Sequence, residues 1–267
     1  GAEVIKVETR QRMDYMRLGR PIIGSEPDPE QHPMFHNVNR SKLSIAVNTT
    51  KPAAIDLIKK LVAHCDIVLE NFSPGVMDRL GLGYDVMSGI RPGLVMASLS
   101  ANGQTGPLRD LRAYAPSIGS LSGLDSTIGY EDGESPGRPL GMKHAYGDVC
   151  AALHGVFAVL SALYRRRHTR EGQYIDLSMA EATTMLLPEV LMDYSMNQRV
   201  SVPMGNRDQA YAPQGNYPCQ GQDQWIGITV ADDGQWRGLC RALNCAELLE
   251  DARFCDGLNR WRNSDAL

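Results

Sequence analysis

The sequence predicts an α/β protein in which a larger, Rossmann-like domain with a parallel sheet precedes a smaller α+β domain. Short apolar runs, typical of buried strands, alternate with helical patterns along most of the chain, and this alternation favours a parallel sheet. Proline, glycine and asparagine become frequent from Ser201 onward, which indicates a linker. We therefore expect the large domain at residues 1–200, the linker at 201–216 and the start of the small domain at 217–267.

The elements of the large domain follow from the spacing of apolar side chains. Pro52–His64 predicts a helix, because apolar residues recur three and four positions apart while Lys59 and Lys60 lie off that stripe. The polar, Pro- and Gly-rich stretch Thr9–Phe35 predicts a loop. The expected strands are the short apolar runs Val4–Val7, Leu43–Val47, Cys65–Leu69, Leu94–Ser100 and Gln173–Leu177.

Three further segments predict helices. Glycines interrupt Val76–Ile90, which should therefore form two short helices. Asp148–Arg167 has the longest helical pattern and carries small residues along its length. Ala180–Met196 predicts a helix with a kink at Pro188, where the missing N–H removes a hydrogen bond. Between these elements we expect a mixed apolar and Ser-containing stretch at Tyr114–Gly123, a polar loop at Leu124–Met142 and a connector at Ser201–Gln222. In the small domain we expect a strand at Trp225–Val230 and a helix at Asp233–Leu243.

Composition limits the class of protein. The chain has 267 residues, a net charge of −4 and 43% hydrophobic residues, enough for a sizeable core. No run approaches the ~18 apolar residues of a membrane span, and the mild acidity gives no general attraction to nucleic acid or anionic membranes. The six cysteines form no CxxC pair and the six histidines no HExxH motif. We therefore expect reduced thiols, no metal site and a cytoplasmic location.

The most informative stretch of the sequence is residues 69–84, LENFSPGVMDRLGLGY. It follows the expected strand Cys65–Leu69 and so places Glu70, Asn71 and a Pro-Gly turn at the carboxyl end of that strand. Ligands of open α/β sheets bind at this edge. Core packing alone does not explain the composition of the stretch, and we expect it to bind a ligand.

Gly147 and Asp148 form a second candidate site. They lie at the start of the long helical pattern, after a polar loop. A carboxylate at a helix N-terminus meets free backbone N–H groups and the positive end of the helix dipole. Asp148 could therefore carry chemistry, although a structural alternative is open, because Asp is also a favoured N-cap residue.

Six ordered segments share a pattern with one family of enzymes: Gly1–Glu8, Asn39–Ile45, Glu70–Gly75, Asp78–Gly81, Gly103–Pro107 and Glu171–Met179. In these segments the chain resembles the family III CoA-transferases, which include the formyl-CoA, crotonobetainyl-CoA and bile-acid CoA-transferases. The resemblance covers nearly the whole chain. Arg170 departs from it, because the family's GxGQxIDxSM motif has its first glycine at this position.

The resemblance implies the family III CoA-transferase fold, an interlocked homodimer, and transfer of CoA between an acyl-CoA and a free carboxylic acid without metal or organic cofactor. It also implies a fragment, since the family's first strand and the C-terminal part of its small domain have no counterpart here. Substrate choice is expected in the loops Leu124–Pro139 and Met204–Gln214. Neither contains the glycine run that covers the site in formyl- and oxalate-specific members, so we expect an acceptor other than oxalate.

By the same resemblance, Asp148 is the nucleophile and Gly147 the glycine of the family's Gly-Asp pair. The Asp148 carboxylate would attack the acyl-CoA thioester to form a mixed anhydride. The released thiolate would then attack the aspartyl carbonyl to form an aspartyl-CoA thioester. Such a site must exclude water, because an anhydride hydrolyses.

Four other residues match CoA-contacting positions of the family: Val47, Asn71, Arg79 and Arg112. Val47 would lie beside the adenine, and Arg112 would approach the CoA phosphates. Each residue also has a structural interpretation. Asn71 could cap the following turn, and Arg79 could pair with a neighbouring aspartate. Arg112 could be an ordinary surface charge and Val47 an ordinary core residue.

Three other functions remain open. The similar α-methylacyl-CoA racemases use a histidine where Tyr114 stands, and tyrosine is a poor proton acceptor near neutral pH. We therefore count Tyr114 as a substrate-binding candidate, and only His144 could take over the racemase role. A dinucleotide-dependent oxidoreductase would need a GxGxxG motif after a strand, which the sequence lacks. The third alternative is a member of the same family that binds CoA without catalysis.

Overall fold

The computed structural model describes residues 1–18, 24, 28–130, 138–142 and 145–267. Contacts within the chain divide it into two compact units, each built from two segments. Unit 1 contains Gly1–Leu111 and Leu153–Ser178, and unit 2 contains Arg112–Ala152 and Met179–Leu267.

These units are discontinuous in sequence. They neither follow nor test the predicted division into residues 1–200, 201–216 and 217–267, which stays a prediction. The predicted α/β class is confirmed, because strands and helices alternate and the strands of unit 1 are parallel.

Unit 1 contains two parallel sheets. In the first, β1 (Ile5–Glu8) pairs with β2 (Leu43–Ala46). In the second, β3 (Ile67–Glu70), β4 (Val95–Ser100) and β5 (Gln173–Ser178) are neighbours in that order. All five strands lie where the apolar runs predict them, with ends that differ by at most two residues.

All helices of unit 1 except α1 match the segments that predict helices. They are α1 (Pro33–Val38), α2 (Pro52–Val62), α3 (Val76–Arg79), α4 (Tyr84–Ile90) and the later turns of α6 (Tyr146–Thr169). The prediction of two short helices after the third strand is confirmed. The prediction that Thr9–Phe35 is a loop is wrong at two places, because α1 begins at Pro33 and a 3-10 turn, η1, spans Tyr15–Arg17.

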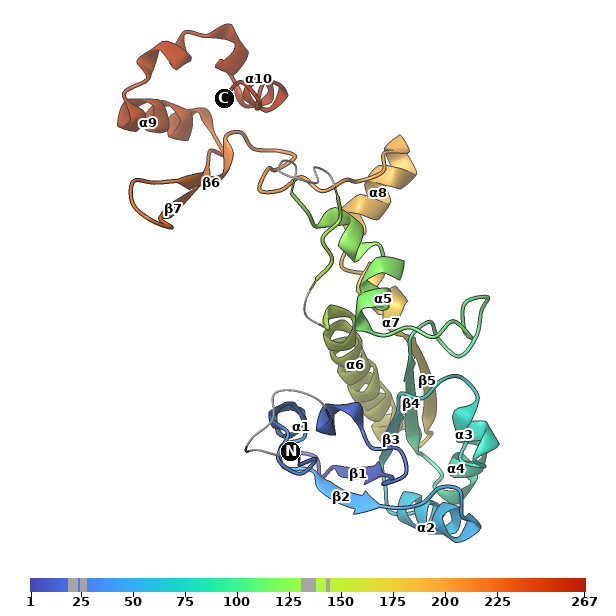
Figure 1. Cartoon of the computed structure of the whole chain (residues 1–267). Helices are drawn as coiled ribbons and strands as arrows, with labels where there is room; N and C mark the ends of the chain where they lie inside the picture. Colours follow the sequence, from blue (N-terminus) through green and yellow to red (C-terminus); the bar gives the residue numbers. More distant parts are fainter. Residues whose placement is uncertain (19–23, 25–27, 131–137, 143–144) are drawn as a thin grey trace. The chain divides into compact units, whose positions relative to one another are not determined.

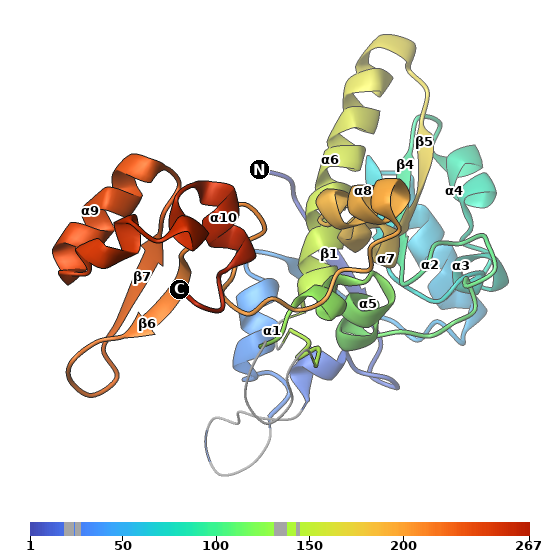
Figure 2. The same cartoon turned by 90° about the horizontal axis from the view of Figure 1, so that it is seen from above.

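Helices cover both faces of the β3–β4–β5 sheet. Alternate residues of β4 point to opposite sides. Met96 packs in one cluster with Ile58 of α2 and Met87 of α4, whereas Val95 and Ala97 pack in a second cluster with Val159 and Ala162 of α6. Figures 1 and 2 show α6 on one side of the sheet and α2, α3 and α4 on the other. This two-sided burial explains why β4 is apolar along most of its length.

A close backbone approach precedes β5. A Cβ atom on Gly172 would lie 2.2 Å from the carbonyl oxygen of Leu94 and 2.8 Å from the carbonyl carbon of Gly93. Arg170, just after α6, has a φ of 66°, in the left-handed region that glycine adopts most easily. The turn into β5 therefore has no room for a side chain at residue 172.

The helical part of unit 2 consists of short helices and the first turns of α6. They are α5 (Ala115–Leu121), the 3-10 turn η2 (Leu124–Thr127), α7 (Met179–Thr184) and α8 (Pro188–Asn197). The predicted kinked helix over Ala180–Met196 is wrong, because Pro188 starts a new helix. A proline disfavours the helical conformation of the residue before it. Leu187, which precedes Pro188, accordingly has φ −119° and ψ 41° and lies outside the helical region.

The C-terminal part of unit 2 is a hairpin with helices. β6 (Gln214–Pro218) and β7 (Trp225–Thr229) are antiparallel, and α9 (Asp233–Leu243), α10 (Gly257–Arg262) and the 3-10 turns η3 (Ala246–Leu249) and η4 (Ala252–Phe254) follow. The predicted linker and connector miss β6, because glycine and proline make it look like a loop.

The core of this part surrounds a buried arginine. Arg260 is 1% exposed, and its guanidinium donates to the Asp233 carboxylate at 2.8 Å and to the carbonyl oxygens of Ala212 and Phe254 at 3.2 Å each. It also lies over the Trp236 ring, 5.4 Å from the centroid. Arg260 thus joins α10, α9 and the segment before β6 through charge-assisted hydrogen bonds.

Of the described helices, α6 alone is long and apolar enough to cross a membrane, judged by length and composition. Core helices of soluble proteins have the same properties, and one third of its most apolar window is buried against the rest of the chain.

Candidate functional site

Asp148 lies in the first turn of α6, as its third residue. The structural alternative that Asp148 is the N-cap is therefore wrong, because the helix begins two residues earlier than the sequence pattern indicates. The side chain is half-buried, and in the described part of the chain its carboxylate has no hydrogen-bond or ion-pair partner. Burial raises the pKa of the Asp148 carboxyl above its ordinary value of 3.8.

Gly147 allows the first turn of α6 to approach its neighbours. A Cβ atom at this position would lie 2.5 Å from Cγ2 of Ile118 in α5 and 3.5 Å from Oγ1 of Thr183 in α7. Both neighbours are almost completely buried, so neither can move aside easily. The Gly-Asp pair has a physical basis here, since the glycine fixes the close packing that sets the position of Asp148.

Tyr114 and Arg112 precede α5 in the same unit. Tyr114 is the residue before the first turn, and its carbonyl oxygen accepts the Ile118 N–H at 2.9 Å. Its side chain is 74% exposed. Arg112 is exposed, and its guanidinium contacts no carboxylate among the described residues. His144, the one candidate for a racemase base, lies outside the described residues.

Asn71 and Arg79 are exposed, and the structure answers their alternative interpretations. The turn after β3 is capped by Glu70 rather than by Asn71, because the Glu70 carboxylate accepts the Phe72 N–H at 2.7 Å. Arg79 forms no ion pair with a neighbouring aspartate in the described region. Its Nη1 atom lies 3.1 Å from where a Cβ of Gly75 would be, so the guanidinium folds back over the turn. Both side chains therefore present unused polar groups to a ligand.

Val47 directly follows β2 and is half-buried. Its side chain packs against the cluster that contains Ile58 and Met96, and its N–H donates to the Glu8 carbonyl oxygen at 2.8 Å. The core interpretation of Val47 is thus supported, and its contact with an adenine ring stays a prediction.

The predicted site residues fall into two sets. Val47, Asn71 and Arg79 belong to unit 1, and Arg112, Tyr114, Gly147 and Asp148 belong to unit 2. Sequence reasoning missed Ile118, whose contact with Gly147 carries no sequence signal. It also gave no role to Gln104 and Asp176, although both lie in motifs that carry the family resemblance.

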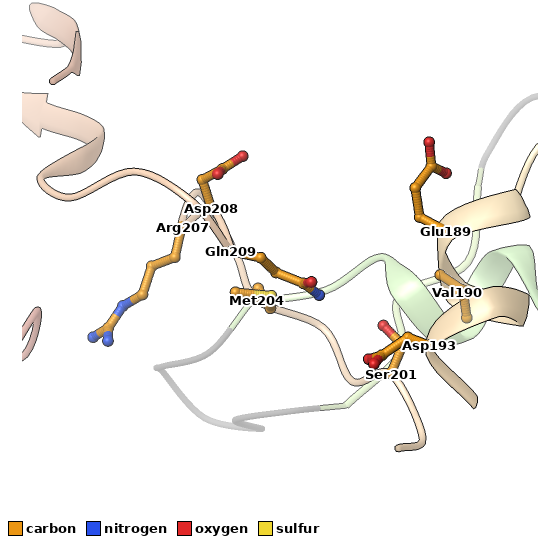
Figure 3. A pocket seen from close by; sticks show the side chains of 8 residues that line it. All are labelled: Glu189, Val190, Asp193, Ser201, Met204, Arg207, Asp208 and Gln209. Carbon is orange, nitrogen blue, oxygen red and sulfur yellow. The ribbon is translucent and has the colours of Figure 1, made fainter. Parts of the chain in front are cut away.

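Met204–Gln214, one of the two loops in which we expect substrate choice, borders a cavity of about 290 Å³ in unit 2. Figure 3 shows Glu189 and Asp193 of α8 on one side of it, with Met204 and Gln209 opposite and Arg207 directed away. Carboxylates on the wall repel an anionic ligand, so we do not place a carboxylic acid substrate there. No group of three His, Cys, Asp or Glu side chains in the described ranges could hold a metal ion.

Sequence and structure comparisons identify the family. The profile of CoA-transferase family III matches residues 1–267. The chain belongs to CoA-transferase family III. Among the curated members, it is 35% identical over 267 residues to the acetyl-CoA:oxalate CoA-transferase of Acetobacter aceti, across 100% of this chain and 66% of that protein. It is 32% identical over 268 residues to the succinyl-CoA:glutarate CoA-transferase of Mus musculus, across 100% of this chain and 59% of that protein.

Two solved structures have the same fold. A CAIB/BAIF family protein from Brucella suis superposes with a TM-score of 0.85 at 31% identity, covering 100% of this chain and 68% of that one. A hypothetical protein from Mycobacterium tuberculosis gives a TM-score of 0.81 at 26% identity with the same coverage. The family and the fold expected from the motifs are confirmed, whereas the oxidoreductase alternative loses its basis. The chain spans less than two thirds of the length of the two curated relatives.

Proposed function

We propose that this protein is an acyl-CoA:carboxylate CoA-transferase in which Asp148 is the nucleophile. One observation carries the proposal. Asp148 is a half-buried carboxylate that no cation and no hydrogen-bond donor engages in the described part of the chain. Structural carboxylates of this burial are paired, so an unpaired one beside a tightly packed glycine fits a reacting group.

Each step of the reaction uses groups on the substrates or on Asp148. A carboxylate oxygen of Asp148 attacks the thioester carbonyl, the C–S bond breaks, and CoA thiolate leaves a mixed anhydride behind. The thiolate attacks the aspartyl carbonyl and releases the donor acid, which leaves an aspartyl-CoA thioester. No metal or organic cofactor takes part in this scheme.

The second half of the reaction mirrors the first. The acceptor carboxylate attacks the aspartyl thioester, thiolate departs, and a new mixed anhydride forms. The thiolate then attacks the acyl carbonyl of the acceptor, which yields the new acyl-CoA and regenerates the Asp148 carboxylate. The partial desolvation that raises the pKa of Asp148 also makes its ionised form a better nucleophile.

The exposed polar groups of the predicted set would bind CoA. Arg79 and Arg112 supply cations for its phosphates, and Asn71 supplies an amide for hydrogen bonds. We place the adenine beside Val47 and the substrate carboxylate near Tyr114. These assignments rest on the family resemblance and on the absence of competing partners for both arginines among the described residues.

We propose a dicarboxylic acid as the acceptor. The two curated relatives are named for transfer to oxalate and to glutarate. The expectation that this chain does not use oxalate stays a prediction, and a substrate panel that contains both acids tests it.

We further propose that the protein is an interlocked homodimer in the cytoplasm. Leu153, Phe157, Leu160 and Tyr164 lie on one face of α6 and are 59–74% exposed. A continuous apolar stripe of this kind usually contacts another protein surface, and a second copy would cover it. The cytoplasmic location rests on the sequence alone, whose six cysteines form no CxxC pair.

Mass spectrometry of the full-length protein incubated with a panel of acyl-CoAs tests the mechanism. We expect a covalent acyl or CoA adduct on Asp148, cleaved by hydroxylamine and lost in Asp148→Ala. The control is Asp66→Asn, which changes a carboxylate paired with Arg91 and Arg166 on the surface of unit 1. It should retain the adduct.

Two results would contradict the proposal. Exchange of the α-proton into deuterated water without an adduct would indicate racemase chemistry. CoA binding with neither adduct nor exchange would indicate a member of the family that binds CoA without catalysis.

A further inference from the structure

Three of the family motifs meet at one edge of the β3–β4–β5 sheet. In the parallel register Glu70 lies opposite Ser98, and Ser98 lies opposite Asp176. The segments that follow β3 and β4 therefore leave the sheet side by side (Figure 1). The residues that join these segments have no role in the mechanism above.

Gln104, in the motif Gly103–Pro107, contacts both of the other motifs. Its backbone N–H donates to both carboxylate oxygens of Asp176, at 2.9 and 3.1 Å. Its side-chain oxygen Oε1 accepts the N–H of Gly75 at 3.4 Å. One residue thus links the β5 carboxylate to the turn that follows β3.

Gly103 makes this connection possible. It is buried, has a φ of 83°, and a Cβ there would lie 3.7 Å from Oδ1 of Asp176. Its left-handed backbone turns the Gln104 N–H toward the carboxylate, which other residues would do only with strain.

Glu70 fixes the other end of the same turn. It is 8% exposed, and its carboxylate accepts the Phe72 N–H at 2.7 Å. The segment between Glu70 and Gly75, which carries Asn71, is therefore held at both ends. Gly75 has a φ of 72° and directly precedes α3, whose last residue is Arg79.

We propose that Asp176 and Gln104 are positioning residues for CoA binding, which act by fixing the turn that presents Asn71 and Arg79. This inference rests on the proposed CoA-transferase function and adds two residues to it. An ordered turn binds more tightly than a mobile one, because the ordering entropy is lost before the ligand arrives. Neither residue needs to touch the reacting atoms.

The test measures CoA affinity and turn mobility separately. Calorimetry with free CoA should give a Kd about tenfold higher for Asp176→Ala than for the wild type, which corresponds to about 1.4 kcal/mol. Asp176→Asn retains an oxygen acceptor and should recover part of this loss. Gln104→Met removes only the Gly75 contact and should also weaken binding. Amide exchange of peptides that cover residues 72–76 should accelerate in Asp176→Ala and in Gln104→Met.

The kinetic readout separates positioning from general damage. KM for the acyl-CoA should rise in Asp176→Ala, while the rate of Asp148 adduct formation at saturating acyl-CoA stays near that of the wild type. Asp66→Asn serves as the control, and it should change neither the Kd nor the exchange.

The outcomes distinguish two failures. A wild-type protein that binds no CoA would overturn the proposed function, and the inference with it. A wild-type protein that binds CoA, with an unchanged Kd in both Asp176→Ala and Gln104→Met, would overturn the positioning role alone. Faster exchange without a change in Kd would also overturn it, because the contacts of Asp176 and Gln104 would then order the turn without contributing to CoA binding.

Discussion

Gly147 and Ile118 lie so close that residue 147 has no room for a methyl group, since its Cβ would be 2.5 Å from Cγ2 of Ile118. Gly147 belongs to α6 and Ile118 to α5, and the contact lies directly beside the proposed nucleophile. The position of Asp148 therefore depends on the packing of its neighbour.

We expect Gly147→Ala to lower the free energy of unfolding by about 1–3 kcal/mol through overpacking. Alanine has a higher helix propensity than glycine by about 1 kcal/mol, so a net loss would come from the collision. The rate of Asp148 adduct formation should also fall. Urea denaturation and adduct mass spectrometry measure the two effects.

The double variant Gly147→Ala/Ile118→Ala provides the control for this prediction. Because Ile118→Ala removes the colliding methyl group, the cost of the double change should be smaller than the sum of the two single costs. Additive costs would show that the two residues are not coupled.

The proposed reaction should depend on pH through Asp148. Only the ionised carboxylate attacks a thioester, and burial raises the pKa of Asp148 above 3.8. The single-turnover rate of adduct formation should therefore drop about tenfold per pH unit below that raised pKa. A rate that still exceeds half its maximum at pH 3.8 would contradict the assignment.

The same burial predicts an effect on stability. Between 3.8 and the raised pKa the folded state binds more protons than the unfolded state, so stability falls as pH increases through this window. At neutral pH the Asp148 charge is therefore unfavourable, and Asp148→Asn should increase Tm while it abolishes the adduct. This gain should shrink as the pH approaches 3.8.

Arg79 should contribute to CoA affinity. Its guanidinium folds over the turn at Gly75 and pairs with no carboxylate among the residues described. We expect Arg79→Ala to increase the Kd for CoA about tenfold at low salt, with a smaller effect at high salt because charges are screened. Arg237→Ala, which changes an exposed arginine of α9, is the matched control. Equal affinity of the two variants would exclude this role.

Arg260 should be essential for the C-terminal hairpin and its helices. Its replacement by methionine leaves the Asp233 carboxylate and the carbonyl oxygens of Ala212 and Phe254 without their shared donor. The Asp233 side chain is 53% exposed and can bind water instead, so the cost comes mainly from the two carbonyl oxygens, at about 1–3 kcal/mol each. Thermal unfolding should show the loss in Arg260→Met but not in Arg262→Ala, which changes an exposed arginine of the same helix.

The departure from the family motif at Arg170 predicts a stabilising change. Arg170 has a φ of 66°, and its N–H donates to the Arg166 carbonyl oxygen at 2.8 Å at the end of α6. Glycine is the favoured residue in this left-handed position after a helix. We expect Arg170→Gly to increase stability by up to about 1 kcal/mol, measured by urea denaturation. A loss of stability would show that a contact of the Arg170 side chain stabilises the fold by more than its positive φ costs.

The sequence predicts the strands of unit 1 and α2 well, because burial on both faces of a sheet or on one face of a helix leaves a periodic apolar pattern. It fails where a single residue decides the outcome. Pro188 starts a helix instead of bending one, and β6 is made of residues that usually form loops. Short helices such as α10 depend on one cap, here the Asp256 carboxylate that accepts the Asn259 N–H at 2.8 Å.

The site shows the same division. The motifs identify Asp148, Asn71 and Arg79 as candidates, because their residue types and positions are local properties of the chain. The contacts that position them join segments far apart in sequence, such as Gly147 with Ile118 or Gln104 with Asp176. Local spacing does not encode these contacts.

Gly172 can serve as a reference position for loss of folding in a mutational scan of this protein. Its contact with the backbone of Leu94 excludes every other side chain, and it takes no part in the proposed chemistry. Variants at this position should disappear from an abundance selection as completely as from an activity selection. Variants at Asp148 should remain abundant and be lost only when cells depend on the product. The two positions together therefore distinguish variants that do not fold from variants that fold but lack activity.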